Sequence, residues 1–334
     1  MNTKFRQLTS ILFLTFCSIQ FGYSQIIEIN KDGNPNSVST LENLVQDFLI
    51  SGDCSSVSGF KSIVSGIATD TKKKSYGYFN SPTGSSFPFK EGVVITNGRA
   101  YSAGNVSSTV LIDYTNGIPG DADLEKALSQ SGTNDATSIS FNFTATASTF
   151  SFRFLMASEE YYDNYECIYS DSFAFLLRKK GTTEFTNLAV LDDGTPISVT
   201  NINNSTNCAD NTDLFEGYNI KDTNYNGRTK VLIASSNVEP NEEYEIKIVV
   251  ADQGDSSWDT AIFLEAGSFE LGIDLGEDKS IKNNTSVCGD SFLLDANFEG
   301  TSYRWYKDRV EIASATEKTY EANLGDGIYS VIVD

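Results

Sequence analysis

Histidine is absent from the 334-residue chain, so no catalytic triad and no zinc site that depends on an imidazole group can form. Basic residues are also scarce, because 24 Lys and Arg stand against 45 Asp and Glu and give a formal net charge of −21. Nucleic-acid binding requires a basic surface, and this balance argues against such a partner. Apolar runs long enough to span a bilayer are missing as well. We therefore expect no nucleic-acid partner and no transmembrane segment.

Apolar and aromatic residues are plentiful. The composition is 40% hydrophobic and includes 22 Phe and 16 Tyr, which supplies enough apolar surface for a folded core despite the acidic charge. At about 100–200 residues per domain, the length favours two domains or one large β-domain with a smaller companion.

The first 24 residues have the pattern of a secretory signal peptide. Lys4 and Arg6 provide a positive start, an apolar stretch begins at Ile11, and the small residue Ser24 precedes the expected cleavage point before Gln25. The stretch is too short and too interrupted to be a good membrane span. We therefore expect residues 1–24 to be removed and the protein to be secreted or placed on the cell surface.

Export changes the interpretation of the cysteines. Cys54, Cys167, Cys208 and Cys288 follow the signal peptide, and disulfides persist outside the cytoplasm. None of them has zinc-type spacing. Cys167 and Cys208 lie in polar, loop-like stretches of the same expected domain, and we favour them as a pair, although sequence alone does not determine connectivity.

Alternating and helical patterns predict a mainly β fold with one or two short helices. Ser39 and Glu42 have capping-box spacing before a helical apolar repeat that starts at Leu41, and a second helix is expected over Asp121–Ser129. Elsewhere apolar residues alternate with polar ones, as in short strands separated by Gly, Asn, Asp and Ser turns. This pattern predicts a large antiparallel β-sandwich. The clearest strands are expected at 138–143, 149–156, 244–250 and 261–269.

Several short motifs occur in a fixed order in the larger part of the chain. They are Gly120-Asp121-Ala122-Asp123-Leu124, Thr133-Asn134-Asp135-Ala136, Ser158-Glu159-Glu160-Tyr161, Asp171-Ser172-Phe173-Ala174-Phe175, and the run from Asp259 to Phe269. In these motifs residues 25–271 resemble the choice-of-anchor L domain family of exported bacterial surface proteins. The resemblance implies a surface location, often reached by type IX secretion. It implies no particular catalytic role.

The C-terminal residues 272–334 resemble a bacterial Ig-like or PKD-like module. The features that carry this resemblance are Cys288-Gly289-Asp290, the segment from Phe292 to Asp295, Tyr303 to Tyr306 with a core Trp305, and Gly327 to Val333. Such modules commonly carry a second cysteine after the last strand, and none follows Val333 here. We therefore expect a small Ig-like β-sandwich that is truncated, or an unpaired Cys288.

Acidic residues gather where strands are expected to end. Calcium takes six to eight oxygen ligands, and Asp alternating with Gly and Ser on a flexible turn provides them. We predict a calcium site that draws on Asp252, Asp255, Asp259, Glu159 and Asp171. The alternative is that these carboxylates cap helices, form turns and solvate an acidic face. No other cofactor is expected.

An enzymatic interpretation finds less support. A glycosidase needs two carboxyl groups about 5–10 Å apart, but the adjacent Glu159 and Glu160 would point to opposite faces of a strand. We therefore expect no enzyme, and we predict an adhesion or surface-binding module whose partner is a surface glycan or protein. The alternatives are a structural surface or matrix component without a specific ligand, and a carbohydrate-active hydrolase that uses paired carboxylates.

Tyrosines are concentrated around Cys167, at Tyr161, Tyr162, Tyr165 and Tyr169. Exposed tyrosines stack on sugars or anchor protein contacts. The alternative is that they pack over the edge of the sandwich.

Overall fold

A computed structural model describes the protein at residues 25–50, 57–145, 149–269, 291–296, 302–308, 310–323 and 327–333. The predictions that concern the signal peptide at 1–24, Cys54, Cys288 and the domain boundary near residue 272 lie outside the described residues.

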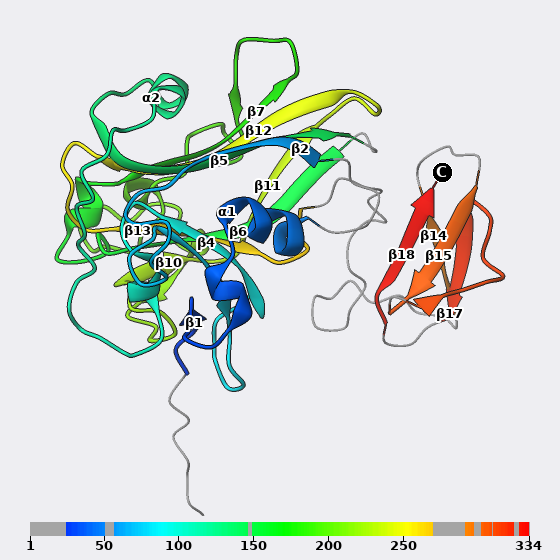
Figure 1. Ribbon diagram of the computed structural model, residues 1–334, viewed down its shortest axis with the longest axis horizontal. Helices are drawn as coiled ribbons and strands as arrows, with labels where there is room; N and C mark the ends of the chain where they lie inside the picture. Colours follow the sequence, from blue (N-terminus) through cyan, green and yellow to red (C-terminus); the bar gives the residue numbers. More distant parts are fainter. Residues whose placement is uncertain are drawn as a thin grey trace, which may run out of the picture.

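Two antiparallel sheets face each other and form a sandwich-like fold (Figure 1), as the alternating pattern predicts. The first sheet has eight strands: β1 (Glu28–Ile29), β3 (Tyr76–Asn80), β4 (Glu91–Thr96), β13 (Thr260–Glu265), β6 (Thr149–Ser158), β10 (Gly227–Thr229) and β9 (Phe215–Tyr218) in spatial order, with β11 (Leu232–Asn237) also paired to β6. The second sheet has five strands: β2 (Val57–Ile63), β5 (Thr133–Thr144), β12 (Glu243–Gln253), β7 (Ser172–Lys179) and β8 (Thr186–Asn187).

Aromatic side chains fill the space between the sheets. Successive residues of a strand point to opposite faces, so Phe152 and Phe154 of β6 enter this central core while Leu155 faces the other way. Their rings contact Phe175 of the opposite sheet, with centroids 4.8 Å and 4.7 Å away. The phenylalanine-rich strands are therefore structural, as the sequence predicts.

Further apolar clusters cover the outer faces of both sheets. Leu155 and Phe263 belong to a second buried cluster beneath the N-terminal segment and its neighbouring loops. Leu124 packs with Leu176 and Val249 on the outer face of the five-stranded sheet. Because β7, β13 and the second half of β6 are buried on both faces, their sequences are nearly continuously apolar there.

Two short helices accompany the sheets. Helix α2 (Ala122–Leu128) begins after Asp121, whose carboxylate accepts hydrogen bonds from the backbone N–H groups of residues 123 and 124 at 3.1 Å, as predicted. Helix α1 (Leu41–Leu44) continues into the π-helical segment η2 (Val45–Leu49). The predicted Ser39 cap is wrong, because Thr40 accepts the capping bond from the backbone N–H of Asn43 and Glu42 bonds Ser62 instead.

Short 3₁₀ segments shape the connections between strands. They are η1 (Pro35–Val38), η3 (Ala100–Ala103), η4 (Tyr165–Cys167), η5 (Val199–Asn201) and η6 (Thr212–Leu214). Strand β13 ends at Glu265, earlier than predicted, because residues 266–267 form a turn that returns Phe269 to the central core. Within the described part of the chain, no helix has the length and apolar character needed to cross a membrane.

The described C-terminal residues form two small antiparallel sheets. One pairs β14 (Ser291–Asp295) with β17 (Thr319–Asn323), and the other orders β16 (Val310–Glu311), β15 (Tyr303–Lys307) and β18 (Tyr329–Val333). Trp305 is fully buried, as expected, and its indole N–H donates to the carbonyl of Glu317 at 2.9 Å. The assignment of this part to an Ig-like module stays a prediction.

Candidate functional site

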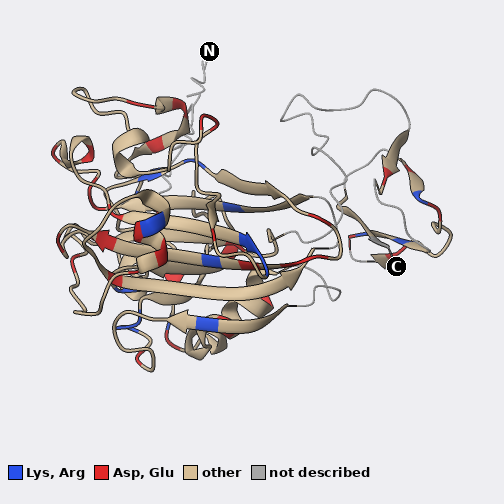
Figure 2. Ribbon diagram, turned by 90° about the horizontal axis from the view of Figure 1, so that it is seen from above, with Lys and Arg blue, Asp and Glu red and all other residues tan. Residues whose placement is uncertain are grey.

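Six strand ends meet at one end of the sandwich. Neighbouring strands run antiparallel, so β4, β6 and β12 end where β5, β7 and β13 begin. The register places Ser158 of β6 opposite Thr260 of β13, and Ala251 of β12 opposite Ser172 of β7. The residues next to these positions in the sequence therefore lie together at this end, although they come from both sheets. Figure 2 shows acidic segments at this end, on the left of the view.

Four of the five predicted calcium ligands are brought to this end and buried. Glu159 is 0% exposed, Asp252 and Asp259 are each 1% exposed, and Asp171 is 5% exposed. Asp255 is not among them, because it lies on an exposed turn where its carboxylate accepts the backbone N–H of Ser257 at 3.0 Å. The other four predicted ligands therefore lie at the same end of the sandwich, and Asp255 lies apart from them.

Asn97 connects the two sheets within this group. Its side-chain Nδ2 donates to Asp171 Oδ2 at 2.6 Å and also to Asp252 Oδ1, while its Oδ1 accepts the backbone N–H of Thr260 at 2.8 Å. One amide from the end of β4 thus fixes two carboxyl groups of the opposite sheet. We call Glu159, Glu160, Asp171, Asp252 and Asp259 the buried carboxyl cluster.

Glu160 completes this cluster although it was not among the predicted ligands. Its carboxyl group accepts the backbone N–H of Asp171 at 3.0 Å and the hydroxyl of Thr260 at 3.0 Å, and it also bonds the Ser158 hydroxyl. Glu159 points elsewhere, since it accepts the backbone N–H of Ile112 at 2.9 Å. The carboxyl groups of these adjacent glutamates therefore bond to different segments of the chain.

Asp259 is held against a backbone that only glycine allows. A Cβ atom at Gly98 would lie 1.5 Å from Asp259 Oδ2, so any other residue at this position would displace the carboxyl group. Asp259 Oδ1 accepts the backbone N–H of Tyr114 at 3.1 Å. Glycine at position 98 is therefore what leaves room for the Asp259 carboxyl group.

Burial and repulsion from neighbouring carboxylates raise the pKa of every member of the cluster. Burial is the larger cause throughout, and it brings the pKa of Glu159 to about 8, that of Asp259 to about 7 and that of Asp252 to about 10. The charge of Asp171 adds to the effect on Asp252. Burial is also the main cause that raises the pKa of Glu160 and of Asp171; repulsion from Asp252 adds to the effect on Glu160, and repulsion from Glu160 adds to the effect on Asp171.

No lysine or arginine forms an ion pair with the cluster among the described residues. Three carboxyl oxygens of the cluster are buried without a hydrogen-bond partner in the described residues: Glu159 Oε2, Asp252 Oδ2 and Asp259 Oδ2. Buried charges are ordinarily paired, neutralised by protons or bound to a metal ion. The cluster therefore requires either protons or a cation at neutral pH.

The carboxyl oxygens do not surround a common point in the geometry of a bound ion. In the part of the chain that the structure describes, no group of three or more Cys, Asp or Glu side chains is arranged to hold a metal as it stands. The Asn97 amide lies between Asp171 and Asp252 instead. The donor chemistry suits calcium, whereas binding requires Asn97 to give up these bonds.

Sequence reasoning missed Asn97, Gly98 and Thr260. The pair Asn97-Gly98 follows the apolar strand β4 and has the pattern of an ordinary turn, and no local signal distinguishes it from other Asn-Gly pairs. The sequence offers Glu160 only as a carboxylate of the hydrolase alternative, not as a calcium ligand. The adjacency of these residues depends on strand pairing between segments far apart in the sequence.

A disulfide supports the loop that leads from β6 to β7. Cys167 and Cys208 are bonded, with Cα atoms 5.6 Å apart and a sequence separation of 41. The same two segments are joined by Asn164 Oδ1, which accepts the Asn207 side-chain N–H at 2.8 Å. The 162–169 loop is thereby fixed to the segment around residue 207.

We expect the Cys167→Ser/Cys208→Ser variant to unfold at lower urea concentration, with a loss of about 2–4 kcal/mol. The physical reason is that a cross-link over this separation restricts the unfolded chain. Urea unfolding followed by far-UV circular dichroism measures the change, and reduced wild-type protein is the control. Equal stability of the variant and the oxidised wild type would contradict the expectation.

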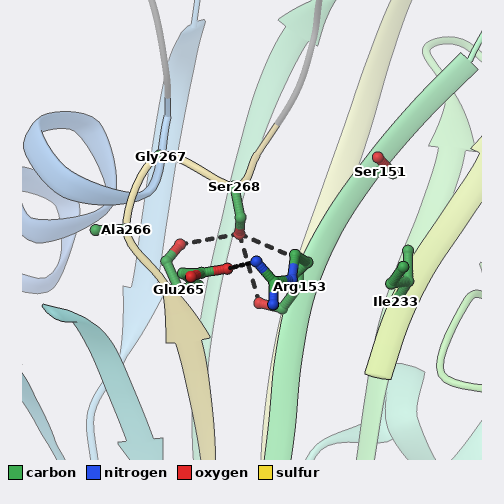
Figure 3. A pocket seen from close by; sticks show the side chains of 7 residues that line it. All are labelled: Ser151, Arg153, Ile233, Glu265, Ala266, Gly267 and Ser268. Carbon is green, nitrogen blue, oxygen red and sulfur yellow. Dashed lines mark hydrogen bonds and ion pairs between the residues drawn. The ribbon is translucent and has the colours of Figure 1, made fainter. Parts of the chain in front are cut away.

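A depression on the described surface lies away from the cluster. It has a volume of about 350 Å³ and is lined by Arg153, Glu265, Ser268 and four neighbours (Figure 3). Arg153 already pairs with Glu265 at 2.7 Å. Glu265 is at the opposite end of β13 from Asp259, about 20 Å away at the rise of a strand. The depression is therefore separate from the carboxyl cluster.

The fold and this site define an antiparallel β-sandwich protein whose two sheets are joined at one end by buried carboxyl groups. The chain belongs to the choice-of-anchor L domain family, whose family model matches residues 31–270. This match confirms the resemblance carried by the ordered motifs and associates the chain with exported proteins of the cell surface. No curated protein and no solved structure matches the chain.

Proposed function

We propose that the chain is an adhesion module of an exported surface protein, and that a calcium ion at the buried carboxyl cluster holds the loops at that end of the sandwich. The observation that carries the calcium proposal is the burial of five carboxyl groups from both sheets without a Lys or Arg ion pair in the described residues.

Calcium fits the chemistry of these groups. It prefers carboxylate and amide oxygens, and the cluster contains only oxygen donors together with the amide of Asn97. The unpartnered oxygens of Asp252 and Asp259 supply lone pairs that no protein hydrogen occupies. Extracellular calcium also stays at concentrations at which modest affinity suffices. Release of Asn97 from Asp171 and Asp252 is the local change that binding demands.

Protons are the competing means of neutralising the cluster. The raised pKa values favour protonated carboxyl groups in the metal-free protein, and protonated carboxyl groups need no ion. Above neutral pH protons are scarce, whereas calcium can still be supplied. In that range the calcium explanation predicts that added calcium stabilises the fold, and the proton explanation predicts no effect.

Hydrolysis is not proposed. A glycosidase must bring its carboxyl groups into contact with the scissile bond, but the five carboxyl groups of the cluster are at most 5% exposed. A structural component without a specific ligand is the remaining alternative, and it is distinguished by the absence of binding to surface polymers.

We expect the full chain to melt at higher temperature in calcium than in chelator. At a calcium concentration 100 times the dissociation constant, binding adds about 2.7 kcal/mol to the free energy of unfolding. Differential scanning calorimetry at about pH 8 measures the shift, and magnesium tests selectivity because its smaller, octahedral shell suits a flexible site poorly.

Matched variants test whether the calcium-dependent shift in melting temperature arises at the carboxyl cluster. Asp171→Asn/Asp252→Asn removes two ionisable groups of the cluster and is expected to abolish the calcium shift. Asp255→Asn, on the exposed turn, is the control and is expected to retain it. A calcium shift that is absent in the wild type, or equal in all three proteins, rules out calcium at the cluster.

A further inference from the structure

Four aromatic rings form an exposed patch beside the carboxyl cluster. Tyr162, Tyr165 and Tyr169 come from the loop that follows Glu160, and Trp258 directly precedes Asp259. The ring centroid of Trp258 lies 4.2 Å from that of Tyr165 and 6.1 Å from that of Tyr162, and Tyr165 lies 5.6 Å from Tyr169. We call these four residues the aromatic patch.

The patch is open to solvent, in contrast to the other aromatic clusters of the sandwich. Tyr162 is 49% exposed and Tyr169 is 47% exposed, and Tyr165 and Trp258 are half-buried. The adjacent Ile168 is 70% exposed. Exposed aromatic groups gathered in one place mark interaction sites more often than isolated exposed residues do.

The polar tips of these rings have no hydrogen-bond partner in the part of the chain that the structure describes. Among the described residues, no hydrogen bond is made by the hydroxyls of Tyr162, Tyr165 and Tyr169 or by the indole N–H of Trp258. The buried Tyr161 differs, since its hydroxyl donates to the carbonyl of Ile202 at 2.7 Å. The patch therefore combines apolar ring faces with donors and acceptors that a ligand can use.

The backbone holds the patch in place. Trp258 has φ of 68°, a left-handed conformation that costs a bulky residue free energy and is kept only where neighbouring contacts enforce it. Such contacts are present, because Asp259 N–H donates to the carbonyl of Ile112 at 3.0 Å and Thr115 Oγ donates to the carbonyl of Ser256 at 3.0 Å. An ordered patch loses little entropy on binding.

The tyrosine side is ordered as well. The backbone N–H of Tyr169 donates to the carbonyl of Tyr165 at 2.8 Å, and Cys167 in the same turn is bonded to Cys208. The patch is thus supported from two directions, by the disulfide and by the loop that enters β13.

The two segments that form the patch carry acidic but no basic side chains, and this balance bears on the kind of ligand that binds there. Neither 161–171 nor 252–260 contains a lysine or arginine, whereas Asp163 and Asp255 are exposed. Polyanions such as uronic-acid polymers and anionic membranes are therefore repelled. The apolar face of a neutral sugar ring packs on an aromatic ring, and its hydroxyl groups pair with tyrosine, indole and carboxylate groups at the rim.

We propose that the aromatic patch is the binding site for a neutral glycan chain. The proposal deepens the surface-binding function and rests on it. It does not depend on whether the carboxyl cluster holds calcium, because the ordering contacts of the patch are already present in the structure.

Binding of the full chain to immobilised mannan, β-glucan and alginate tests the proposal. We expect retention on a neutral polysaccharide and none on alginate, the acidic polymer. Tyr162→Ala/Tyr169→Ala removes two exposed rings without opening the core, and affinity is expected to fall at least about tenfold. Ile233→Ala, which truncates another exposed apolar side chain (66% exposed) on β11, is the control and is expected to bind as the wild type does.

Tryptophan fluorescence gives a second measurement. The chain has two tryptophans, and Trp305 is fully buried, so an emission change caused by soluble mannan or β-glucan oligosaccharides reports on Trp258. Trp258→Phe is expected to remove that change. A change that persists in this variant contradicts a site at the patch.

The outcomes separate this proposal from the surface-binding function. If the tyrosine variant binds neutral glycan as tightly as the wild type does, the patch is not the site but surface binding stands. Preference for alginate, or binding of a lysine-rich peptide in place of glycan, overturns the ligand class. A wild type that binds none of these probes overturns both proposals.

Discussion

In chelator, the free energy of unfolding of the full chain is expected to fall as the pH rises from about 5.5 to about 8.5. Burial raises the pKa of Glu159 from 4.5 to about 8 and that of Asp259 from 3.8 to about 7. In this range the folded chain keeps protons that the unfolded chain has released, so folding takes up protons. The stabilisation is therefore fully present below the unfolded pKa values and is lost as pH rises through the folded ones.

The effect is large because several groups act together. Each group with a raised pKa contributes about 1.4 kcal/mol per pH unit between its two pKa values. Urea unfolding at a series of pH values measures the slope. Most small proteins have maximal stability between about pH 5 and 8, so a continuous decline across this range is distinctive.

Replacing Asp252 with Asn provides the internal control. The pKa of Asp252 is raised to about 10, and a neutral amide of similar shape removes its share of the pH dependence. We expect the metal-free Asp252→Asn variant to be more stable than the wild type at about pH 8 and to have a flatter profile. Stability that instead rises with pH in the wild type would show that the carboxyl groups are solvated or paired.

Replacing Arg228 with Met is expected to cost about 3–5 kcal/mol in the free energy of unfolding. Arg228 Nη2 contacts Asp222 Oδ2 at 2.9 Å, and the two side chains are 4% and 0% exposed. Without the guanidinium, Asp222 keeps, among the described residues, only the Ser86 hydroxyl at 2.9 Å and remains a buried, unneutralised charge. Urea unfolding at about pH 7 measures the loss.

Two further variants establish the cause. Arg178→Met breaks the pair with Glu245, whose side chains are 28% and 20% exposed, and partly exposed pairs contribute about 0–1 kcal/mol. Arg228→Met/Asp222→Asn removes both buried charges and is expected to recover much of the lost stability. Equal losses for Arg228→Met and Arg178→Met would mean that burial does not determine the cost.

Local patterns predicted most of the fold. The strand that alternates Phe150, Phe152, Phe154 and Met156 has one apolar face toward the central core, as its period requires. Helix α2 begins at Asp121 because a carboxylate there satisfies free backbone N–H groups. The Ser39 cap failed because Thr40, a neighbouring residue of the same capping type, takes that place, and local sequence does not choose between two adjacent caps.

The candidate site was predicted less completely. Glu159, Asp171, Asp252 and Asp259 were selected as acidic residues at strand ends, and the structure buries all four. Asp255 has the same local pattern but lies on an exposed turn. Its neighbours in sequence do not reveal this difference, because burial depends on which strands from elsewhere in the chain cover a position.

The sequence by itself determined the class of protein: an acidic, histidine-free β chain with the ordered motifs of an exported surface family. These properties depend on composition, on period-two alternation and on short motifs, which are all local. Only the tertiary structure decided that Asn97 bridges Asp171 to Asp252, and that Trp258 joins Tyr165 at the surface. Both contacts arise from the antiparallel pairing of distant strands, which fixes which ends meet and which side chains lose their access to water.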